Sequence, residues 1–334
     1  MRCVAAPAGG LAPPTVEERA ALEAVRHLNK RFPRAGLREV PLVRARDLDG
    51  HADPTGRSRV WLALEMLQVT GSFKVRGALV SLDARRPHGR VVAAGGGNHA
   101  LAVAYAGRVL ELAATICVPR NTPRERRVQL ERYGADVLTA MGDSRKEAEI
   151  LARRVAVAEG AAFVSARDDL DVVRGSGASL GFEIVRALGG VPERVLAPLG
   201  GGGLATGLAW ALAVEAADAV AAGHDGWPHL ERSVWGVQSE GASSVHDPSA
   251  RALSSVAGIL AVRESSIQAA MVHASRDMGL LLEWRAAVAL APVLSGLPEA
   301  LRGGDVVVVL TGRNEQRGRA PAILETAPRD DGRV

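Results

Sequence analysis

Four consecutive glycines, Gly200 to Gly203, constrain the fold of this chain more than any other stretch. They stand between a short apolar run at residues 195–197 and a segment in which leucine recurs with helical spacing from Leu204. A strand, a glycine turn and a helix in this order direct several backbone N–H groups to one point at the positive end of the helix dipole. Glycine permits the close approach and the positive φ angles that such a turn needs. The stretch therefore predicts a phosphate cradle, and a flexible turn is the alternative that composition alone leaves open.

The overall composition indicates a globular protein with an ordinary surface. The chain has 334 residues, of which 47% are apolar and 23% charged, enough for a sizeable core and two lobes. The formal net charge is +4 and the pI is about 9.6. The arginines are dispersed and have acidic neighbours, and only 3% of the residues are aromatic. We therefore expect a solvated surface and no nucleic-acid partner.

The sequence also predicts where the protein resides. Its two cysteines, Cys3 and Cys117, provide no disulfide framework. The N-terminal residues lack the apolar segment of a secretory signal, and no uninterrupted apolar run approaches the roughly 18 residues of a membrane span. We expect a cytoplasmic protein without a membrane partner.

Apolar runs alternate with helical segments along most of the chain. This alternation predicts an α/β fold of right-handed βαβ units with mainly parallel sheets. The expected strands are 59–64, 91–94, 115–118, 136–139, 162–165, 194–198, 234–237 and 306–310. The expected helices are 15–30, 100–107, 123–133, 146–158, one that ends at 188 and one that follows the four glycines. Residues 1–14 and 315–334 are expected to be disordered or irregular tails, because they are rich in proline and in small or polar residues.

One lysine has an unusual setting. Lys74 lies in the stretch T-G-S-F-K-V-R-G, among small residues and a single aromatic one. A lysine in such a setting can be partly desolvated, which lowers its pKa and makes it a usable nucleophile. An ordinary surface lysine is the alternative. The chain is rich in arginine and has only two other lysines, Lys30 and Lys146, which favours a function for Lys74.

Two more turns follow predicted strands. Gly95-Gly96-Gly97-Asn98-His99 stands between a strand and a helix, so its N–H groups suit an anion such as a carboxylate and the Asn98 amide can bond a ring hydroxyl. A plain turn with an asparagine cap is the alternative. Thr311-Gly312-Arg313-Asn314 follows the strand at 306–310, at the end of a parallel strand where ligands gather. A simple turn is again the alternative.

Together these four motifs resemble the fold-type II pyridoxal-phosphate enzymes, and most closely the short serine/threonine dehydratase and serine racemase branch. The likeness runs from about Pro41 to Asn314 and includes Y-G-A at 133–135, G-V-Q-S-E-G at 236–241 and Glu283. It implies a fold like that of the tryptophan synthase β-subunit, with two lobes that each contain a mainly parallel twisted sheet flanked by helices. It also implies a large cofactor-binding lobe of residues 15–87 plus 162–314, a small mobile lobe of residues 88–161, and a homodimer.

The resemblance also implies roles for individual residues. Lys74 would hold pyridoxal 5'-phosphate covalently and later remove the α-proton of an amino-acid substrate. The other cofactor contacts would be Phe73 beside the ring, Asn98 at the 3′ oxygen, Gly200, Gly201, Gly202 and Gly203 at the phosphate, and Thr311 at the pyridine nitrogen. The substrate carboxylate would be held by Ser72, Gly95, Gly96, Gly97, Asn98 and His99. A hydroxyl at the pyridine nitrogen suits elimination of a β-substituent, which yields a 2-oxo acid and ammonia.

The chain departs from the family pattern at several of these positions. Glycine stands at 95 and 96, where serines are common; the second serine is the opposite-face acid/base of the racemases, so Gly96 argues against racemisation. Gln238 and Ser244 replace acidic residues of the racemase cation site, and we expect no metal. Arg285 and Arg313 are unusual in their motifs and could recruit a second anionic group, a β-carboxylate or a phosphoester, if they do not point to solvent.

Three functions are compatible with this pattern. The first is β-elimination on a β-hydroxy amino acid such as L-serine or L-threonine. The second is β-replacement or β-elimination on an activated or phosphorylated amino acid in a specialised biosynthetic pathway. The third is a degenerate protein that binds the cofactor without turnover.

Overall fold

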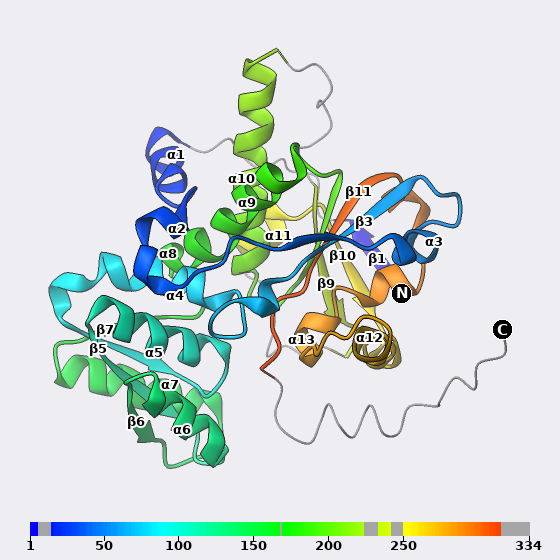
Figure 1. The fold of residues 1–334 in the computed structure, drawn as a ribbon. Helices are drawn as coiled ribbons and strands as arrows, with labels where there is room; N and C mark the ends of the chain where they lie inside the picture. The colour runs from blue at the N-terminus through cyan, green and yellow to red at the C-terminus, as the bar shows by residue number, and fades with distance from the viewer. Residues whose placement is uncertain (6–14, 168, 224–232, 242–249, 315–334) are drawn as a thin grey trace.

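The structure, a computed structural model, describes residues 1–5, 15–167, 169–223, 233–241 and 250–314. Two sheets organise these residues, and Figure 1 shows them in separate parts of the molecule. The larger sheet has seven strands in the order β1-β10-β9-β8-β11-β3-β2. Their bounds are Arg2–Ala5 (β1), Leu42–Arg44 (β2), Ser58–Ala63 (β3), Arg194–Pro198 (β8), Val234–Ser239 (β9), Gly258–Val262 (β10) and Gly304–Val309 (β11). The five inner strands are parallel, and β1 and β2 pair antiparallel at the two edges.

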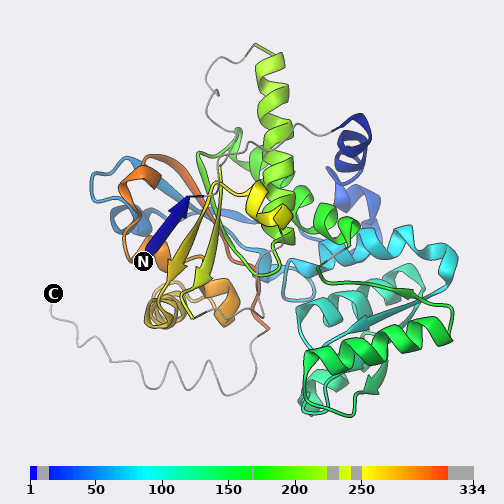
Figure 2. The ribbon, with the colours of Figure 1, turned by 180° about the vertical axis from the view of Figure 1, so that it is seen from behind.

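The smaller sheet has four parallel strands in the order β6-β5-β4-β7. They are Arg90–Ala94 (β4), Ala113–Val118 (β5), Asp136–Thr139 (β6) and Ala162–Phe163 (β7). Helix α5 (Asn98–Leu110) covers one face and α7 (Arg145–Ala158) the other, while α6 (Arg124–Arg132) connects β5 to β6. Figure 2 shows this lobe from behind, with α7 in front of the sheet. Because β7 pairs with β4, the small sheet extends beyond the boundary that we expected at residue 161.

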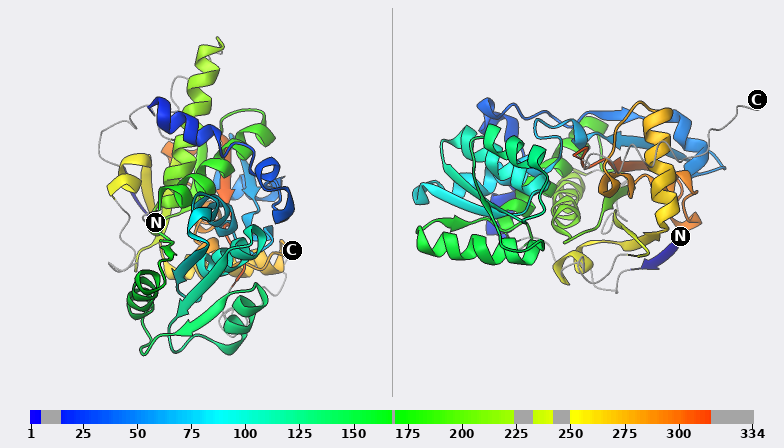
Figure 3. Two further views of the ribbon diagram at one scale, coloured as in Figure 1. Left: turned by 90° about the vertical axis from the view of Figure 1, so that its left-hand side faces the viewer. Right: turned by 90° about the horizontal axis from the view of Figure 1, so that it is seen from below.

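Helices cover both faces of the large sheet. On one face pack α3 (Asp49–Ala52), α12 (Glu264–Arg276), α13 (Trp284–Ala287) and α14 (Ala291–Leu294), and on the other α9 (Ser179–Leu188) and α10 (Gly203–Ala221). The further helices outside the small lobe are α1 (Val16–Glu23), α2 (Leu28–Arg31), α4 (Lys74–Ala84), α8 (Leu170–Val173) and α11 (Ala250–Ser255). Short 3-10 turns lie at Pro33–Ala35, Arg46–Leu48, Glu65–Leu67, Arg86–His88 and Glu299–Leu301, and a π-helical turn lies at Arg174–Ala178. Figure 3 shows the two lobes side by side along the molecule.

The alternation of buried residues along β11 shows how the large lobe is built. Val306 and Val308 pack with the cluster that contains α12, and Val307 and Val309 pack with the cluster that contains α9 and α10. The strand is therefore buried on both faces, which explains its uninterrupted run of valines. This confirms the α/β fold with mainly parallel sheets that the sequence predicts.

Among the described helices, only α10 is long and apolar enough to cross a membrane by length and composition. Half of its apolar window is buried inside the protein. It packs against α9 and the π-helical turn Arg174–Ala178, where Gly177 and Gly207 let the backbones approach closely. The core of the large lobe accounts for the apolar composition of this helix.

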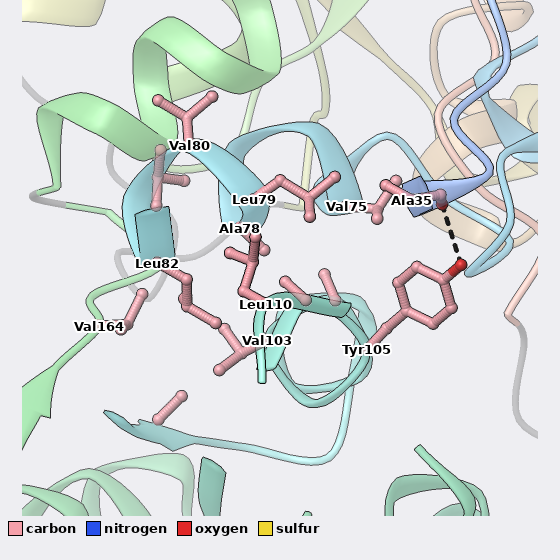
Figure 4. Close-up of a cluster of buried hydrophobic side chains, with 14 of the residues drawn as sticks. Ala35, Val75, Ala78, Leu79, Val80, Leu82, Val103, Tyr105, Leu110 and Val164 are labelled. Carbon is pink, nitrogen blue, oxygen red and sulfur yellow. Dashed lines mark hydrogen bonds between the residues drawn. The ribbon is translucent and has the colours of Figure 1, made fainter. Parts of the chain in front are cut away.

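The two lobes share one apolar cluster, because α4 packs against α5. Figure 4 shows Val75, Leu79 and Leu82 of α4 facing Val103 and Leu110 of α5. In the same cluster the Tyr105 hydroxyl of α5 donates a hydrogen bond to the Ala35 carbonyl at 2.9 Å. Helix α4 therefore lies at the junction of the two lobes, and its first residue is Lys74.

The structure corrects three details of the sequence prediction. Residues 2–5 are not part of a tail but form β1, in which Cys3 is paired with Leu260 of β10. The helix expected over 15–30 is interrupted after Glu23 and resumes at Leu28. Strands β2 and β10 and helix α12 were not expected. Residues 6–14 and 315–334 of the expected tails lie outside the described residues.

Candidate active site

The turn that precedes Lys74 joins the turn that follows β11. Ser72 forms an isolated antiparallel bridge with Gly312. The Phe73 N–H donates to the Thr311 carbonyl at 3.1 Å, and the Arg313 N–H donates to the Gly71 carbonyl at 3.0 Å. Two motifs that lie far apart in the sequence thus form one site at the carboxyl end of the large sheet.

Asn314 connects three parts of this site. Its Nδ2 donates to the Thr70 carbonyl and to Asn98 Oδ1, each at 2.8 Å. Gly71 has a φ of 75°, and a Cβ atom there would stand 2.6 Å from Asn314 Oδ1. Only glycine is compatible with both the backbone conformation and this contact. Asn314 was part of a predicted motif, but the sequence did not indicate that it holds Asn98.

Asn98 also contacts Glu283, a buried residue of the large lobe. Its Nδ2 donates to Glu283 Oε1 at 2.8 Å and Oε2 at 3.0 Å, and the Glu283 N–H donates to the Gly312 carbonyl at 3.1 Å. The contact of Asn98 with the cofactor's 3′ oxygen stays a prediction. It requires that one amide hydrogen of Asn98 leaves Glu283.

Lys74 has the properties of a nucleophilic amine. Its side chain is partly buried, and Nζ lies 4.8 Å from the centroid of the Phe73 ring. Burial, together with the positive charges of Arg145 and Arg285, lowers the pKa of Lys74 to about 8, while Glu283 acts in the opposite direction. A pKa near the working pH gives a substantial fraction of neutral amine, which is the form that attacks a carbonyl.

His99 lies buried in the first turn of α5. Its Nε2 is 3.2 Å from the Val164 carbonyl, and a carbonyl can only accept, so Nε2 carries the proton. Nδ1 is then an acceptor, and it has no partner among the described residues. Burial and the charge of Lys74 lower the pKa of His99 to about 3. A neutral acceptor does not suit a carboxylate, so only the backbone N–H of His99 fits the predicted substrate role.

The turn before α5 presents fewer donors than we predicted. The Gly95 N–H donates to the Cys117 carbonyl at 2.8 Å and is therefore occupied. Gly97 is the N-cap of α5, so the N–H groups of the first helical turn have no acceptor within the helix.

The hydroxyl of Ser72, on the turn before α4, has no partner in the described part of the chain. Ser72 Oγ is fully buried. This buried hydroxyl is therefore available to bond an atom of a ligand.

Gly96 is in contact with a residue that sequence reasoning missed. A Cβ atom on Gly96 would stand 2.9 Å from Thr122 Cγ2 and 3.3 Å from Thr122 Oγ1. The Thr122 side chain, which is buried, fills the space of a side chain at position 96. A side chain at position 96 would therefore require Thr122 to move.

The four glycines form the turn between β8 and α10. Gly202 has a φ of 90°, and α10 begins at Gly203. A Cβ atom on Gly201 would stand 3.2 Å from Arg167 Cγ. The charge of Arg167 also acts on Lys74. The helix N-terminus and the lysine therefore belong to the same site.

Of the two arginines singled out in the sequence, Arg285 lies near Lys74, and Arg313 is exposed with its N–H bound to Gly71. No pattern in the sequence pointed to Arg145 and Arg167.

Three further residues named in the sequence analysis have different outcomes. Thr311 is buried, and its role at the pyridine nitrogen stays a prediction. Gln238 lies at β9 and Ser244 lies outside the described residues.

Comparisons with known proteins agree with this geometry. Residues 34–312 match the family described as pyridoxal-phosphate dependent enzyme. A Sinorhizobium fredii protein named as a threonine dehydratase is 33% identical over 321 residues, which cover 89% of this chain and 93% of that protein. The solved threonine deaminase of T.th. is 29% identical, with a TM-score of 0.72, covering 91% of this chain and 99% of that one. The processed threonine deaminase isoform 2 of Solanum lycopersicum shares the fold, with a TM-score of 0.79, 23% identity and coverage of 98% and 99%.

The residues present fit the cofactor of this family. The N-terminus of α10 provides the glycine turn that a phosphate requires, Lys74 provides an amine of lowered pKa for an aldehyde, and the buried Ser72 hydroxyl can bond a ligand atom. With the match over most of its length, the chain belongs to the fold-type II family of pyridoxal-phosphate dependent enzymes.

Proposed function

We propose that this protein is a pyridoxal-phosphate dependent ammonia-lyase, which converts L-threonine or L-serine to the 2-oxo acid and ammonia. Its relatives named as threonine dehydratase and threonine deaminase support this activity. The observation that carries the proposal is the position of Lys74. Its amine has a lowered pKa, its charge acts on His99 in the first turn of α5, and Ser72, two residues before it, has a buried hydroxyl without a partner among the described residues.

Each part of the site has a distinct task. Pyridoxal phosphate, when bound, supplies an electron sink for the α-carbon. Gly200 to Gly203 hold its phosphate through backbone N–H groups. The Ser72 hydroxyl and the first N–H groups of α5 orient the substrate carboxylate. Lys74 Nζ, as a neutral amine, accepts the α-proton, and the β-hydroxyl leaves as water.

The proposal favours elimination over racemisation. Position 96 carries no hydroxyl that could protonate the opposite face of the α-carbon. Incubation with L-serine should therefore produce pyruvate with little D-serine, which chiral chromatography of the product mixture measures.

The test of the proposed function is direct. The purified holoenzyme is incubated with L-threonine and with L-serine, and 2-oxobutanoate and pyruvate are quantified. Lys74→Ala should lower kcat by about 10³-fold or more, because the base is removed. Lys146→Ala removes a lysine from α7 and serves as the matched control, which should keep the activity. A holoenzyme with bound cofactor that forms no 2-oxo acid from either amino acid would overturn the proposal.

We also propose, from the resemblance to the family, that the protein is a cytoplasmic homodimer. Light scattering of the holoenzyme after size-exclusion chromatography measures the mass of the particle, and a monomeric mass would contradict the dimer.

A further inference from the structure

The Asn98 side chain is held from two directions by side chains of the large lobe. Asn98 is the first residue of α5 in the small lobe, whereas Glu283 precedes α13 and Asn314 follows β11. Asn98 Nδ2 donates to Glu283 Oε1 at 2.8 Å and to Oε2 at 3.0 Å. Asn98 Oδ1 accepts from Asn314 Nδ2 at 2.8 Å. We call Glu283, Asn98 and Asn314 the amide chain, and it crosses the junction of the two lobes.

The chemistry at its two ends fixes the direction of the amide chain. A carboxylate only accepts hydrogen bonds, so the Asn98 group that faces Glu283 is the NH2 group. The Thr70 carbonyl also only accepts, and it bonds Asn314 Nδ2 at 2.8 Å. If the Asn98 amide were turned over, its oxygen would face a carboxylate and its NH2 group would face another NH2 group. One orientation of the Asn98 amide is therefore strongly favoured.

A glycine allows the close contacts of the amide chain. A Cβ atom on Gly312 would stand 2.7 Å from Glu283 Oε1 and 3.1 Å from Asn98 Nδ2. Gly312 is the residue that forms the isolated bridge with Ser72, two residues before Lys74. The bond between Asn98 and Glu283 is thus packed directly against the backbone that pairs with the Lys74 turn.

Asn314 is also bonded to the small lobe through its backbone. Arg126 of α6 donates from Nη2 to the Asn314 carbonyl at 3.0 Å and from Nη1 to Gln129 at 3.1 Å. The backbone and the side chain of Asn314 therefore both make bonds to the small lobe. The residue that orients the Asn98 oxygen is itself held in place.

We propose that Glu283 and Asn314 are positioning residues, which direct the Asn98 NH2 group to the 3′ oxygen of pyridoxal phosphate. This inference rests on the proposed function, because it requires the cofactor at Lys74. Asn98 Nδ2 carries two hydrogens, so one can stay with Glu283 while the other is donated to the cofactor. Because Asn314 occupies Asn98 Oδ1, the amide presents a donor and no acceptor to an anionic oxygen.

The test uses a cofactor analogue that lacks the oxygen concerned. 3-Deoxypyridoxal 5'-phosphate keeps the aldehyde and the phosphate but has hydrogen in place of the 3′ hydroxyl. Fluorescence titration of the apoenzyme gives Kd for the analogue and for pyridoxal phosphate. The ratio of the two, with the analogue as numerator, reports the contacts of the 3′ oxygen. The intrinsic difference between the two compounds is the same for every variant, so the change in this ratio between variants is the readout.

A double variant reverses the amide chain without touching Asn98. Asn314→Asp keeps the shape of the side chain but leaves no hydrogen for Asn98 Oδ1. When Glu283→Gln is added, the new amide at 283 can donate to Asn98 Oδ1, and the new carboxylate at 314 can accept from Asn98 Nδ2. The double variant should lower the ratio by about tenfold, as Asn98→Ala should, because the donor no longer faces the 3′ oxygen. Glu283→Gln alone should keep most of the ratio, since its amide oxygen still accepts from Asn98.

Unfolding measurements separate positioning from a merely structural role. In Asn314→Asp one amide faces two carboxylates, so the denaturant midpoint of the apoenzyme should fall. The addition of Glu283→Gln should recover part of this loss, because the reversed chain is complete. The ratio should stay low in the double variant. A ratio that recovers together with the midpoint would overturn the inference, since the amide chain would then serve only to join the lobes.

Glu193→Gln is the matched control. It removes the same charge from a residue that accepts from the Asp305 N–H at 2.6 Å, at the start of β11 and thus at the opposite end of this strand from the site. This variant should leave the ratio unchanged. A fall in the ratio equal to that of the double variant would show that the loss of charge, and not the orientation of Asn98, controls the binding.

The ratio also separates this inference from the proposed function, because binding requires no turnover. The predicted ratios together with a wild-type holoenzyme that forms no 2-oxo acid would support the amide chain and contradict the lyase. Formation of 2-oxo acid together with a ratio that no variant changes would overturn the amide chain alone.

Discussion

At the scale of single residues, the site depends on pairs that are distant in the sequence. Gly96 and Thr122 together fill the space that a serine side chain at 96 would need. The Asn314 side chain occupies the space that a side chain at Gly71 would need, and Asn314 Nδ2 donates a hydrogen bond to Asn98 Oδ1. In both pairs the glycine leaves room for a larger side chain from a distant segment of the chain.

Introducing serine at position 96 should lower the free energy of unfolding of the protein. In Gly96→Ser the new Cβ would stand 2.9 Å from Thr122 Cγ2, so the threonine must move. Overpacking of this kind costs about 1–3 kcal/mol of the free energy of unfolding, which denaturant titration measures. Gly97→Ser is the matched control for stability, because a Cβ there meets no described atom within 4 Å. The double variant with Thr122→Ala should recover most of the loss, and purely additive effects would contradict the contact.

The lowered pKa of Lys74 predicts a pH dependence of cofactor attachment. The neutral amine reacts with the aldehyde, so the rate at which apoenzyme takes up pyridoxal phosphate should rise with pH through about 8. Removing a positive neighbour makes the ammonium form less unfavourable and raises the pKa, so Arg145→Gln should move the midpoint to higher pH. The absorbance change of the bound cofactor measures both rates. A midpoint that stays fixed or moves downward would show that Arg145 does not act on Lys74.

At the scale of elements, α4 is fixed by a buried ionic group close to its start. Arg76 donates to Glu65 at 2.8 Å and to Glu183 of α9 at 2.7 and 2.8 Å, and all three side chains are buried. The Val40 N–H also donates to Glu183 at 2.8 Å. These bonds connect α4 and α9 and hold the helix that begins with Lys74.

Breaking this ionic group should destabilise the protein strongly. Arg76→Met leaves two carboxylates buried without their cation, which costs about 3–5 kcal/mol of the free energy of unfolding. Arg59→Met is the matched control, since Arg59 pairs with Asp305 at 2.7 Å with its side chain 58% exposed. Exposed pairs contribute about 0–1 kcal/mol. Equal losses in the two variants, measured by denaturant unfolding, would contradict a special role of the buried group.

At the scale of the whole molecule, the two sheets are separate but their cores are not. The apolar cluster around α4 and α5 contains buried residues of both lobes, including Leu79 and Val103. This shared core allows the lobes to present Lys74 and the first turn of α5 to the same space. Movement of the small lobe on substrate binding stays a prediction from the resemblance.

The shared core predicts that both lobes unfold together. The two tyrosines, Tyr105 and Tyr133, lie in the small lobe, whereas the tryptophans among the described residues, Trp61, Trp210, Trp235 and Trp284, lie outside it. Second-derivative ultraviolet absorbance separates the two chromophores during denaturant unfolding. The tyrosine and tryptophan transitions should coincide, as in a cooperative transition. Two separate midpoints would show that the lobes are independent units.

The sequence alone predicted the elements and the family well, because both depend on local features. Periodic apolar residues and the glycine turns specify strands, helices and their order through short-range backbone preferences and burial. The structure confirms the parallel α/β fold and brings the Lys74 turn to the turn after β11. The sequence did not predict β1, because it is a four-residue edge strand whose partner, β10, is distant in the sequence.

What only the tertiary structure decided is which polar groups face one another. The proton on Nε2 of His99 follows from the Val164 carbonyl, and the need for glycine at 96 follows from Thr122. Contacts of this kind depend on the order of strands in each sheet and on how α4 joins the lobes. Local sequence preferences carry no information about such distances, since they act only over a few neighbouring residues.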